Sequence, residues 1–405
     1  MIRFMTGLEI PLIMRINQPY ESLKENISSV MEYDYYGGLL GGALFAFVLL
    51  PFLGLTYTPV LIGSLNLLVA SLVLWHFSNH LVRPRILNIQ FTALLIISVL
   101  AFSVAKPIVL YGEQHKYKDK IIYQEQTRYQ KIVVTQWKDN FWLFINGSTQ
   151  FSTYDEERYH EPLVHPVMSL LKEHKDILLL GAGDGLAARE ILKYSDVESL
   201  TLVDLDPAMT RLARQHKMFL EINQGSLNDT RVRVINKDAY QFMKESPDLY
   251  DAIIIDLPDP KSVSLSLLYS LGFYKMVEKH LKPFGAMVTQ STSPLYSPEA
   301  FLCIKKTMQA ANFSTLPYQN SVPSMGQWGW ILGTRKKTMP ANRLKQEIIA
   351  QKSSDIETRF FNQNAMISMA NFGKGLFEKE DKIKPNTQFN HNILKYYRQG
   401  SWDLY

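Results

Sequence analysis

The chain has 405 residues, of which 46% are hydrophobic and 12% aromatic, and this composition excludes a disordered protein. Its formal charge of +5, from 43 basic and 38 acidic residues, indicates no nucleic-acid binding and fits a protein beside anionic lipid. The single cysteine, Cys303, excludes a disulfide framework and a cysteine-based metal site, so no metal centre is expected.

Three runs near the N-terminus are apolar and long enough to cross a lipid bilayer. They cover residues 37–55, 59–77 and 87–110, about 19 to 24 residues each, and about 20 helical residues span a hydrocarbon core of ~30 Å. Buried helices of a soluble protein are the alternative, and three such runs so close together argue against it. We therefore expect residues 1–115 to form a membrane region with about three transmembrane helices.

Basic residues beside these runs bear on the orientation in the membrane. Arg83 and Arg85 lie between the second and third runs, whereas Lys116, Lys118 and Lys120 follow the third run, on the opposite side. Basic residues favour the cytoplasmic side, and three lysines outweigh two arginines. We expect a multi-pass protein of the inner cell membrane, in contact with the lipid bilayer, with a cytoplasmic catalytic domain.

Strand-like and helix-like segments alternate in the rest of the chain. Residues 131–137 and 141–145 predict a hairpin in a small β-strand domain over 116–165. Further strands are predicted at 176–180, 199–204, 231–236, 251–255 and 286–291, with helices at 207–220, at 267–280 and before residue 194. This alternation predicts an α/β fold, a doubly wound, mostly parallel Rossmann-like sheet over 166–335. Residues 336–405 predict a partly helical C-terminal extension.

Acidic side chains follow three of the predicted parallel strands, where ligands bind to such sheets. The first strand leads into Gly181-Ala182-Gly183-Asp184-Gly185, whose glycines allow a tight turn and a close approach to a ligand. Asp204 ends the second strand and is placed to accept hydrogen bonds from ribose hydroxyls, while Asp206 is placed to cap the helix at Pro207. Asp238 follows the third strand, near an adenine amino group. This pattern indicates a nucleoside site.

The fourth strand ends in Asp256-Leu257-Pro258-Asp259-Pro260, two carboxylates held in a proline-stiffened turn. Such a pair attracts a cationic amine, and one member can accept a proton from an attacking nitrogen. Aspartates are common in turns after strands, so each of them alone has a structural explanation. Five aspartates at successive strand ends favour a catalytic site.

The ordered motifs resemble those of the polyamine aminopropyltransferases, the spermidine synthase family. The soluble part carries the following: Arg128-Tyr129-Gln130, Asp155-Glu156-Glu157-Arg158-Tyr159-His160-Glu161, the glycine turn, Val203-Asp204-Leu205-Asp206 and the proline-stiffened acid pair. Three further runs resemble the bacterial membrane-bound branch: Gly7–Leu12, Gln290–Pro294 and Val322–Gly329. The resemblance covers nearly the whole chain, and relative to that branch it implies a shortened N-terminal membrane region.

The resemblance implies roles for individual residues. Asp256 is the expected proton acceptor. Residues expected to contact the amine or the aminopropyl chain are His160, Asp184, Asp259, Tyr159 and Gln150. Residues expected to bind the nucleoside are Gln130, Asp204, Asp238, Ala239, Gly181 and Gly183. The co-substrate is decarboxylated S-adenosylmethionine, no prosthetic group is expected, and the default acceptor is putrescine. Homo-oligomers are a further implication of the resemblance.

Two other functions stay open at this point. A membrane-attached methyltransferase that uses S-adenosylmethionine would share the fold and the ribose-binding acid, although the acid pair at Asp256 and Asp259 suits an amine substrate better. A non-catalytic membrane protein that binds polyamines is the second alternative. Trp328 and Trp330 would either close the site or belong to a core strand.

Overall fold

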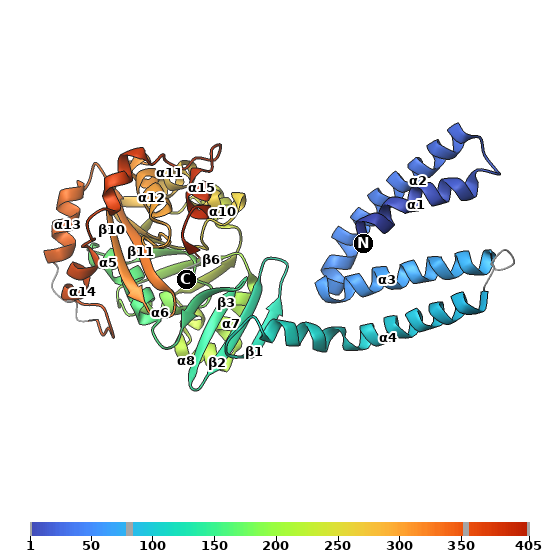
Figure 1. Ribbon diagram of the computed structural model, residues 1–405. Coiled ribbons are helices and arrows are strands. Elements are labelled where there is room, and N and C mark those ends of the chain that lie inside the picture. Colours follow the sequence, from blue (N-terminus) through green and yellow to red (C-terminus); the bar gives the residue numbers. More distant parts are fainter. Residues whose placement is uncertain (1, 78–83, 351–355, 403–405) are drawn as a thin grey trace. The chain divides into compact units, whose positions relative to one another are not determined.

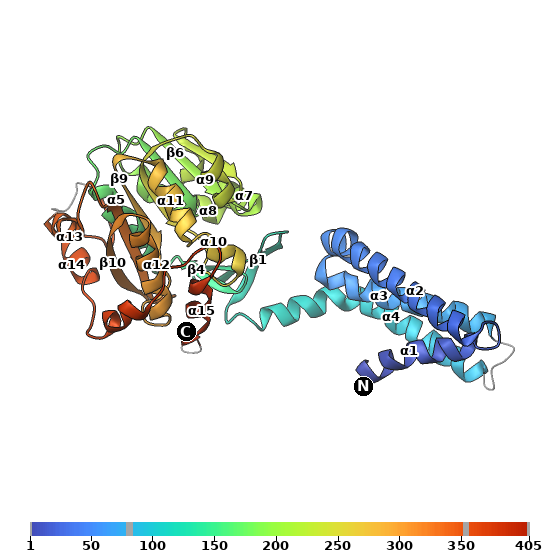
Figure 2. The same cartoon turned by 90° about the horizontal axis from the view of Figure 1, so that it is seen from above.

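The computed structural model describes residues 2–77, 84–350 and 356–402, so Arg83 and parts of the predicted C-terminal extension lie outside the described residues. The chain divides into two compact units, Met1–Lys118 and Asp119–Tyr405. The two views in Figures 1 and 2 show that the first unit is helical and that the second contains the sheets.

The first unit is built of long helices. They are α1 (Ile2–Asn17), α2 (Leu23–Leu44), which continues through the π-helical turn η1 (Phe45–Leu49), α3 (Leu50–His76) and α4 (Pro84–Gln114). A capping box opens α2, in which the Ser22 hydroxyl accepts from Glu25 N while Glu25 bonds back to Ser22. Gly54, at φ 65°, breaks the helical path inside α3.

Apolar helices long enough to cross a bilayer occur in this unit. Among the described residues two helices meet this criterion by length and composition, Leu23–Gly54 and Tyr57–His76. The bent pair Ile89–Val104 and Pro107–Gln114 would be a third if it forms one span. Pro107 lies at the bend, where a proline removes a helical hydrogen bond.

Two β-sheets form the framework of the second unit. The smaller is an antiparallel meander of β1 (Lys120–Gln126), β2 (Lys131–Trp137), β3 (Asn140–Ile145) and β4 (Ser148–Ser152). The larger has seven strands in the order β10-β11-β9-β8-β5-β6-β7. Its strands are β5 (Asp176–Gly181), β6 (Ser199–Asp204), β7 (Val232–Asn236), β8 (Tyr250–Asp256), β9 (Leu281–Gln290), β10 (Phe313–Val322) and β11 (Gly326–Arg335).

The expected α/β sheet is therefore present, with an antiparallel edge that the sequence did not predict. Strands β7, β6, β5, β8 and β9 pair in parallel, whereas β11 joins β9 and β10 joins β11 antiparallel. The inner parallel strands are buried on both faces, whereas the edge strand β7 is not, and β5 shows this burial directly. Its Ile177 and Leu179 belong to one hydrophobic cluster, while Leu178 and Leu180 belong to the other.

Helices supply further side chains to each cluster. The first cluster includes side chains of α5 (Glu157–Ser169), α6 (Leu186–Leu192), α7 (Pro207–Gln215), α8 (Lys217–Ile222), α13 (Ala341–Ala350) and α14 (Gln363–Met369). The second includes side chains of α9 (Ala239–Glu245), α11 (Leu271–His280), α12 (Pro298–Ala310) and α15 (Asn392–Arg398). The C-terminal extension thus contributes to both hydrophobic cores.

Two predicted helices have different bounds in the structure. Predicted helix 207–220 is divided into α7 and α8, because His216 has extended backbone angles of φ −78° and ψ 127°. Predicted helix 267–280 begins only at Leu271, as α11, after the separate short helix α10 (Val263–Leu267), because the Ser270 hydroxyl caps α11 by accepting from Phe273 N. Serine favours helix caps over helix interiors. The sequence-based prediction gave more weight to the apolar pattern around Ser270 than to this preference.

Candidate active site

The parallel strand order brings the expected acids to one edge of the large sheet. Strand β5 lies between β6 and β8, and Gly181 pairs with Asp256 across β5 and β8. Asp204 ends β6 beside Asn236 of β7. The carboxyl ends of parallel strands share an edge, so residues far apart in sequence converge there.

The glycine turn after β5 is tightly packed against both neighbouring strand ends. Gly181 has φ 83°, and a Cβ there would overlap the backbone carbonyl of Asp256. A Cβ on Gly183 would lie 2.5 Å from Asp204 Oδ2. Ala182 between them also adopts a left-handed conformation, with φ 56°, which disfavours a side chain. The turn therefore needs glycine at 181 and 183 for close backbone approach.

Asp204 is held by two backbone donors. Its Oδ2 accepts from Gly183 N at 3.1 Å, and its Oδ1 accepts from Asp206 N at 2.8 Å. Burial raises its pKa to about 6, the hydrogen bond from Asp206 N opposes that shift, and the nearby Asp184 adds to it. The carboxylate is thus oriented at the sheet edge and keeps lone pairs for further donors.

Asp206 connects this corner to the small sheet. It caps α7 as expected, because its Oδ1 accepts from Ala208 N at 3.0 Å. Its Oδ2 accepts from the Thr127 hydroxyl at 2.8 Å. Thr127 Oγ1 in turn accepts from Gln130 N at 3.0 Å. The β1–β2 turn, which carries the expected nucleoside residue Gln130, is thereby fixed beside the end of β6.

Asp238 and Ala239 lie at the start of α9. The Asp238 side chain is exposed and caps the helix, its Oδ1 accepting from Gln241 N at 2.9 Å, while Ala239 is buried. This gives Asp238 a structural role that the sequence analysis did not assign to it, and it leaves the second carboxylate oxygen for other donors. Both residues follow β7, on the same sheet edge as Asp204.

Asp256 is half-buried and hydrogen-bonded to a tyrosine from α5. Tyr159 Oη donates to Asp256 Oδ1 at 2.6 Å. Burial raises the pKa of Asp256 to about 6, a shift that the charge of His160 and the Tyr159 hydrogen bond oppose and Asp184 reinforces. Burial and Asp256 hold the pKa of Tyr159 well above its usual range, so the phenol stays protonated and donates.

Asp259, three residues on, has donors of its own. Its Oδ2 accepts from Tyr397 Oη at 2.9 Å, and Gln290 Nε2 lies 3.4 Å from its Oδ1. Gln290 ends β9 and also donates to the Leu257 carbonyl at 2.6 Å, which holds the turn between the two acids. Tyr269 does the same through its hydroxyl, at 2.9 Å from Leu257 O. In the sequence, Gln290 belongs to one of the motifs that resemble the family, whereas no pattern indicated Tyr269 or Tyr397.

His160 is buried with one ring nitrogen committed. Its Nδ1 lies 2.9 Å from the Glu156 carbonyl and 3.0 Å from Glu156 Oε2. Burial lowers the pKa of His160, but Glu156, Asp184 and Asp256 outweigh it and raise that pKa overall. Asp184 is also buried, its Oδ1 accepting from Leu186 N at 2.8 Å, and burial raises its pKa. His160, Asp184 and Asp256 therefore form one electrostatic group.

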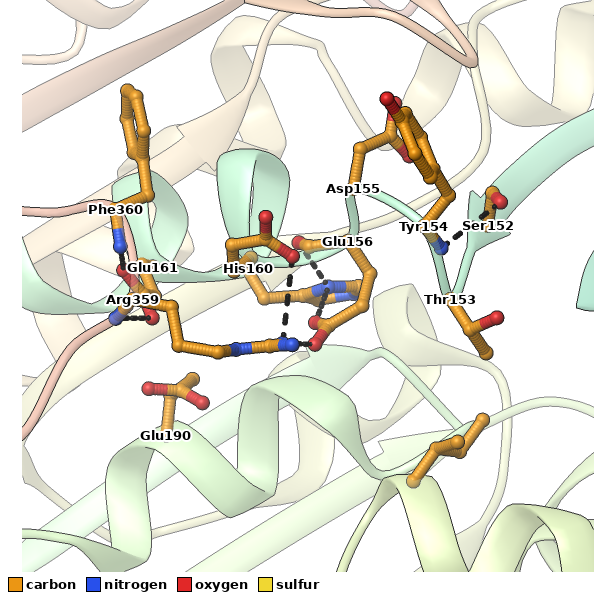
Figure 3. A network of polar contacts seen from close by, with 12 residues as sticks. Ser152, Thr153, Tyr154, Asp155, Glu156, His160, Glu161, Glu190, Arg359 and Phe360 are labelled. Carbon is orange, nitrogen blue, oxygen red and sulfur yellow. Dashed lines mark hydrogen bonds and ion pairs between the residues drawn. The ribbon is translucent and has the colours of Figure 1, made fainter. Parts of the chain in front are cut away.

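Glu156 organises a network behind His160 that the sequence analysis did not identify (Figure 3). Its carboxylate accepts from Arg189 Nη2 at 2.9 and 3.0 Å and from Arg359 of the C-terminal extension. Burial alone would raise the pKa of Glu156, but the hydrogen bond from His160 and the charges of His160, Arg189 and Arg359 lower it to about 2. Glu156 is thus a permanent anion that orients His160.

Gln150 is an expected site residue whose hydrogen bonds are local. It is half-buried in β4, and its Nε2 donates to Ser148 O at 3.2 Å within the same strand. Ser148 Oγ accepts from Lys261 Nζ at 2.6 Å, which links β4 to the loop after Asp259. Trp328 and Trp330 are buried in β11, and the Trp330 ring packs against Tyr159 at 5.4 Å between ring centroids. The tryptophans therefore belong to a core strand that supports Tyr159.

Within the described residues, no group of three or more histidine, cysteine, aspartate or glutamate side chains could hold a metal ion. The arrangement can instead accept hydrogen bonds and bind cations through buried and half-buried carboxylates. Asp204 and the glycine turn form one half of the site, and Asp184, Asp256 and Asp259 form the other. Chemically, this suits a cationic, hydroxyl-bearing ligand beside a base.

A family model for the spermine/spermidine synthase domain matches residues 156–346. A polyamine aminopropyltransferase of Oceanobacillus iheyensis is 38% identical over 99% of this chain and 77% of its own length. One of Leptospira interrogans is 38% identical over 98% of this chain and 77% of its own length. Polyamine aminopropyltransferase 2 of Aquifex aeolicus is 39% identical over 96% of this chain and 76% of its own length.

Solved structures resemble the fold. Spermidine synthase from Thermotoga maritima aligns with a TM-score of 0.57 and 23% identity, covering 65% of this chain and 88% of that chain. A spermidine synthase in complex with the transition state analogue AdoDATO aligns with a TM-score of 0.56 and 22% identity over the same shares. At these identities the structural likeness establishes the fold.

Proposed function

Because the chain belongs to the spermine/spermidine synthase family of polyamine aminopropyltransferases, we propose that it aminopropylates putrescine, giving spermidine and methylthioadenosine. The chain is a transferase, and decarboxylated S-adenosylmethionine is its co-substrate. The observation that carries the proposal is the half-buried Asp256, bonded to Tyr159 at 2.6 Å and followed by Asp259 in the same turn.

The nucleoside half of the site takes the co-substrate through residues already oriented. Asp204 accepts from the ribose hydroxyls with a carboxylate that Gly183 N and Asp206 N hold in place. The Asp238 oxygen that does not cap α9, with Ala239 and Gln130, faces the base. Gly181 and Gly183 allow the ligand to approach the backbone. The sulfonium co-substrate supplies the electrophilic methylene and a neutral thioether leaving group.

The amine half holds and deprotonates the acceptor. Asp259 and Asp184 bind ammonium groups of the acceptor. His160 and Gln150 contact the carbon chain of the amine or the aminopropyl group, and Tyr159 orients Asp256. The amine nitrogen attacks the methylene beside the sulfur, the carbon–sulfur bond breaks, and Asp256 accepts the proton that the nitrogen loses. Buried carboxylates also offset the repulsion between a cationic amine and a sulfonium, so alignment and electrostatics supply most of the rate.

The pH dependence follows from the raised pKa of Asp256. In the free enzyme burial raises that pKa to about 6, so kcat/KM for the amine falls about tenfold per pH unit below pH 6 as the base is protonated. Bound cations stabilise the carboxylate, so the acid limb of kcat lies at a lower pH than that of kcat/KM. Initial rates between pH 5 and 9 measure both limbs. If the acid limbs of kcat and of kcat/KM coincided above pH 7, the assignment of Asp256 as the base would be contradicted.

The acceptor is tested by competition between amines of different length. Detergent-solubilised full-length protein receives decarboxylated S-adenosylmethionine with putrescine, cadaverine, agmatine or spermidine, and methylthioadenosine release is measured. We expect the highest kcat/KM with putrescine. A higher value with any other amine would replace putrescine as the acceptor and leave aminopropyl transfer intact.

We further propose that residues 1–115 anchor the enzyme in the inner cell membrane, as in the bacterial membrane-bound branch, with the catalytic unit in the cytoplasm. Large apolar side chains of these helices are exposed, such as Phe47 at 78% and Phe52 at 81%, and water disfavours such surfaces. The proposed division continues with a small β domain at 116–165, a catalytic domain at 166–335 and an extension at 336–405.

Alkaline carbonate extraction of membranes from expressing cells tests the anchor. We expect the full chain to stay in the membrane pellet, as an inserted helix does, and to dissolve only when detergent is added. A peripheral membrane protein in the same preparation serves as the control that carbonate releases. Recovery of the folded chain in the carbonate supernatant would contradict insertion.

Light scattering of the detergent-solubilised protein tests self-association, and the mass of a single chain would exclude the implied oligomer.

A further inference from the structure

The C-terminal extension is fixed to the catalytic unit at a buried glutamate. Glu161 of α5 is fully buried and accepts three backbone N–H groups of the extension, those of Arg359, Phe360 and Phe361, at 2.8, 2.8 and 2.7 Å. Figure 3 shows Glu161 beside this segment, one residue from His160 in sequence. Hydrogen bonds to a charged acceptor are among the stronger ones in proteins. The extension is thus attached next to the expected amine-binding residues.

A second attachment holds the end of the extension near the acid pair. The fully buried Asn386 donates through its side-chain Nδ2 to Ser266 O at 2.8 Å, and its backbone carbonyl accepts from Leu271 N at 2.9 Å. His391 Nδ1 lies 2.7 Å from Ser266 Oγ. These contacts fix the segment before α15 on α10 and α11, the helices that follow the Asp256–Pro260 turn.

Tyr397 of α15 thereby reaches Asp259 from 138 residues away in sequence. Its hydroxyl donates to Asp259 Oδ2 at 2.9 Å, and its side chain is buried. Trp402 packs on the Tyr397 ring at 4.6 Å between centroids, and Trp402 Nε1 donates to the Tyr397 carbonyl at 2.8 Å. The ring is therefore held from behind while the hydroxyl faces the acid.

This hydrogen bond determines what Asp259 can offer a ligand. The bond to Tyr397 occupies Oδ2 and fixes the carboxylate plane, whereas Oδ1 has Gln290 Nε2 at the longer distance of 3.4 Å. Burial raises the pKa of Asp259, and Lys261 and then Tyr397 counteract it. A carboxylate with one oxygen held and the other directed to a cation is a typical ammonium-binding arrangement.

We propose that the C-terminal extension completes the amine-binding site, with Tyr397 as the positioning residue that orients Asp259 toward the ammonium end of the acceptor. The inference rests on the proposed function and extends it, because it assigns acceptor recognition to α15, which lies outside the matched family domain, residues 156–346. Tyr397 acts through Asp259 and takes no part in the displacement at sulfur, so its effect is confined to the amine.

The test is the Tyr397→Phe variant in the full-length, detergent-solubilised enzyme. This change removes the hydroxyl and keeps the ring that packs on Trp402. We expect KM for the diamine to rise about 10- to 100-fold, the usual effect of losing a hydrogen bond to a charged group. At saturating amine, kcat and KM for decarboxylated S-adenosylmethionine stay within about twofold of wild type, because the nucleoside half is untouched.

Tyr396→Phe is the matched control on the same helix. The Tyr396 hydroxyl accepts from Lys384 N at 3.2 Å and so contributes to the fold of the extension alone. We expect its kinetic constants to equal those of wild type. Tyr397→Phe with an unchanged amine KM would overturn the inference, as would equal losses for both substrates together with a lowered melting temperature. A wild-type enzyme inactive with every amine would instead overturn the proposed function, and this inference with it.

Discussion

Asp256→Asn lowers kcat for aminopropyl transfer by about 10²- to 10⁴-fold, the range expected for loss of a general base. The amide cannot accept the proton of the attacking nitrogen at neutral pH, yet it has the same shape and can still accept from Tyr159 Oη. Affinity for decarboxylated S-adenosylmethionine changes little, because Asp204 and the glycine turn remain. Steady-state release of methylthioadenosine and calorimetric binding of the nucleoside measure the two quantities.

Asp248→Asn provides the control for this variant. Asp248 is an exposed aspartate just before β8, the strand that Asp256 ends, so the substitution removes the same charge outside the site. We expect wild-type kcat from it. Turnover by Asp256→Asn within tenfold of wild type would show that another group accepts the proton. Loss of nucleoside binding would mean that Asp256 shapes the whole site.

Glu156→Gln lowers the free energy of unfolding by about 3–5 kcal/mol, the usual penalty for removing one partner of a buried ion pair. Arg189 is only 8% exposed, and it loses the charge that it binds at 2.9 and 3.0 Å and keeps Glu190 at 2.8 Å, while Arg359 keeps only the longer contact to Glu157 at 3.5 Å. A thermal scan of the detergent-solubilised chain should show a melting temperature about 10 °C below that of wild type.

Activity of Glu156→Gln should fall at temperatures where the variant is still folded, because the amide no longer fixes His160 as the carboxylate does. Glu221→Gln is the control, since Glu221 is largely exposed and pairs with Lys217 at 3.8 Å. Exposed pairs contribute at most about 1 kcal/mol, so the melting temperature should barely move. A similar, small shift for both variants would contradict the structural role of the Glu156 network.

The sequence predicted the strands whose pattern is local. Predicted strands 131–137 and 199–204 coincide with β2 and β6, because apolar runs bounded by turn residues are typical of buried strands. The acids at the strand ends could also be predicted, since parallel strands bring their carboxyl ends to one edge. The sequence analysis did not predict the antiparallel pair of strands β10 and β11.

The parts of the site that the sequence did not reveal depend on contacts between distant segments. Tyr397 reaches Asp259 across 138 residues, and Arg359 reaches Glu156 across 203. Neither tyrosine nor arginine shows a local pattern that marks such a partner, because a polar tail with short helices is typical of a surface segment. Asp238 illustrates the reverse case, in which one residue caps a helix and lies at the expected site.

The most direct test of the central claim compares two donors with the full-length enzyme. Protein with putrescine receives either decarboxylated S-adenosylmethionine or S-adenosylmethionine, and the nucleoside and amine products are quantified by mass spectrometry. We predict equal amounts of methylthioadenosine and spermidine from the first donor, and neither methylated amine nor S-adenosylhomocysteine from the second. Folded protein that binds the decarboxylated donor but aminopropylates no diamine, or that transfers methyl groups, would contradict the assignment as an aminopropyltransferase.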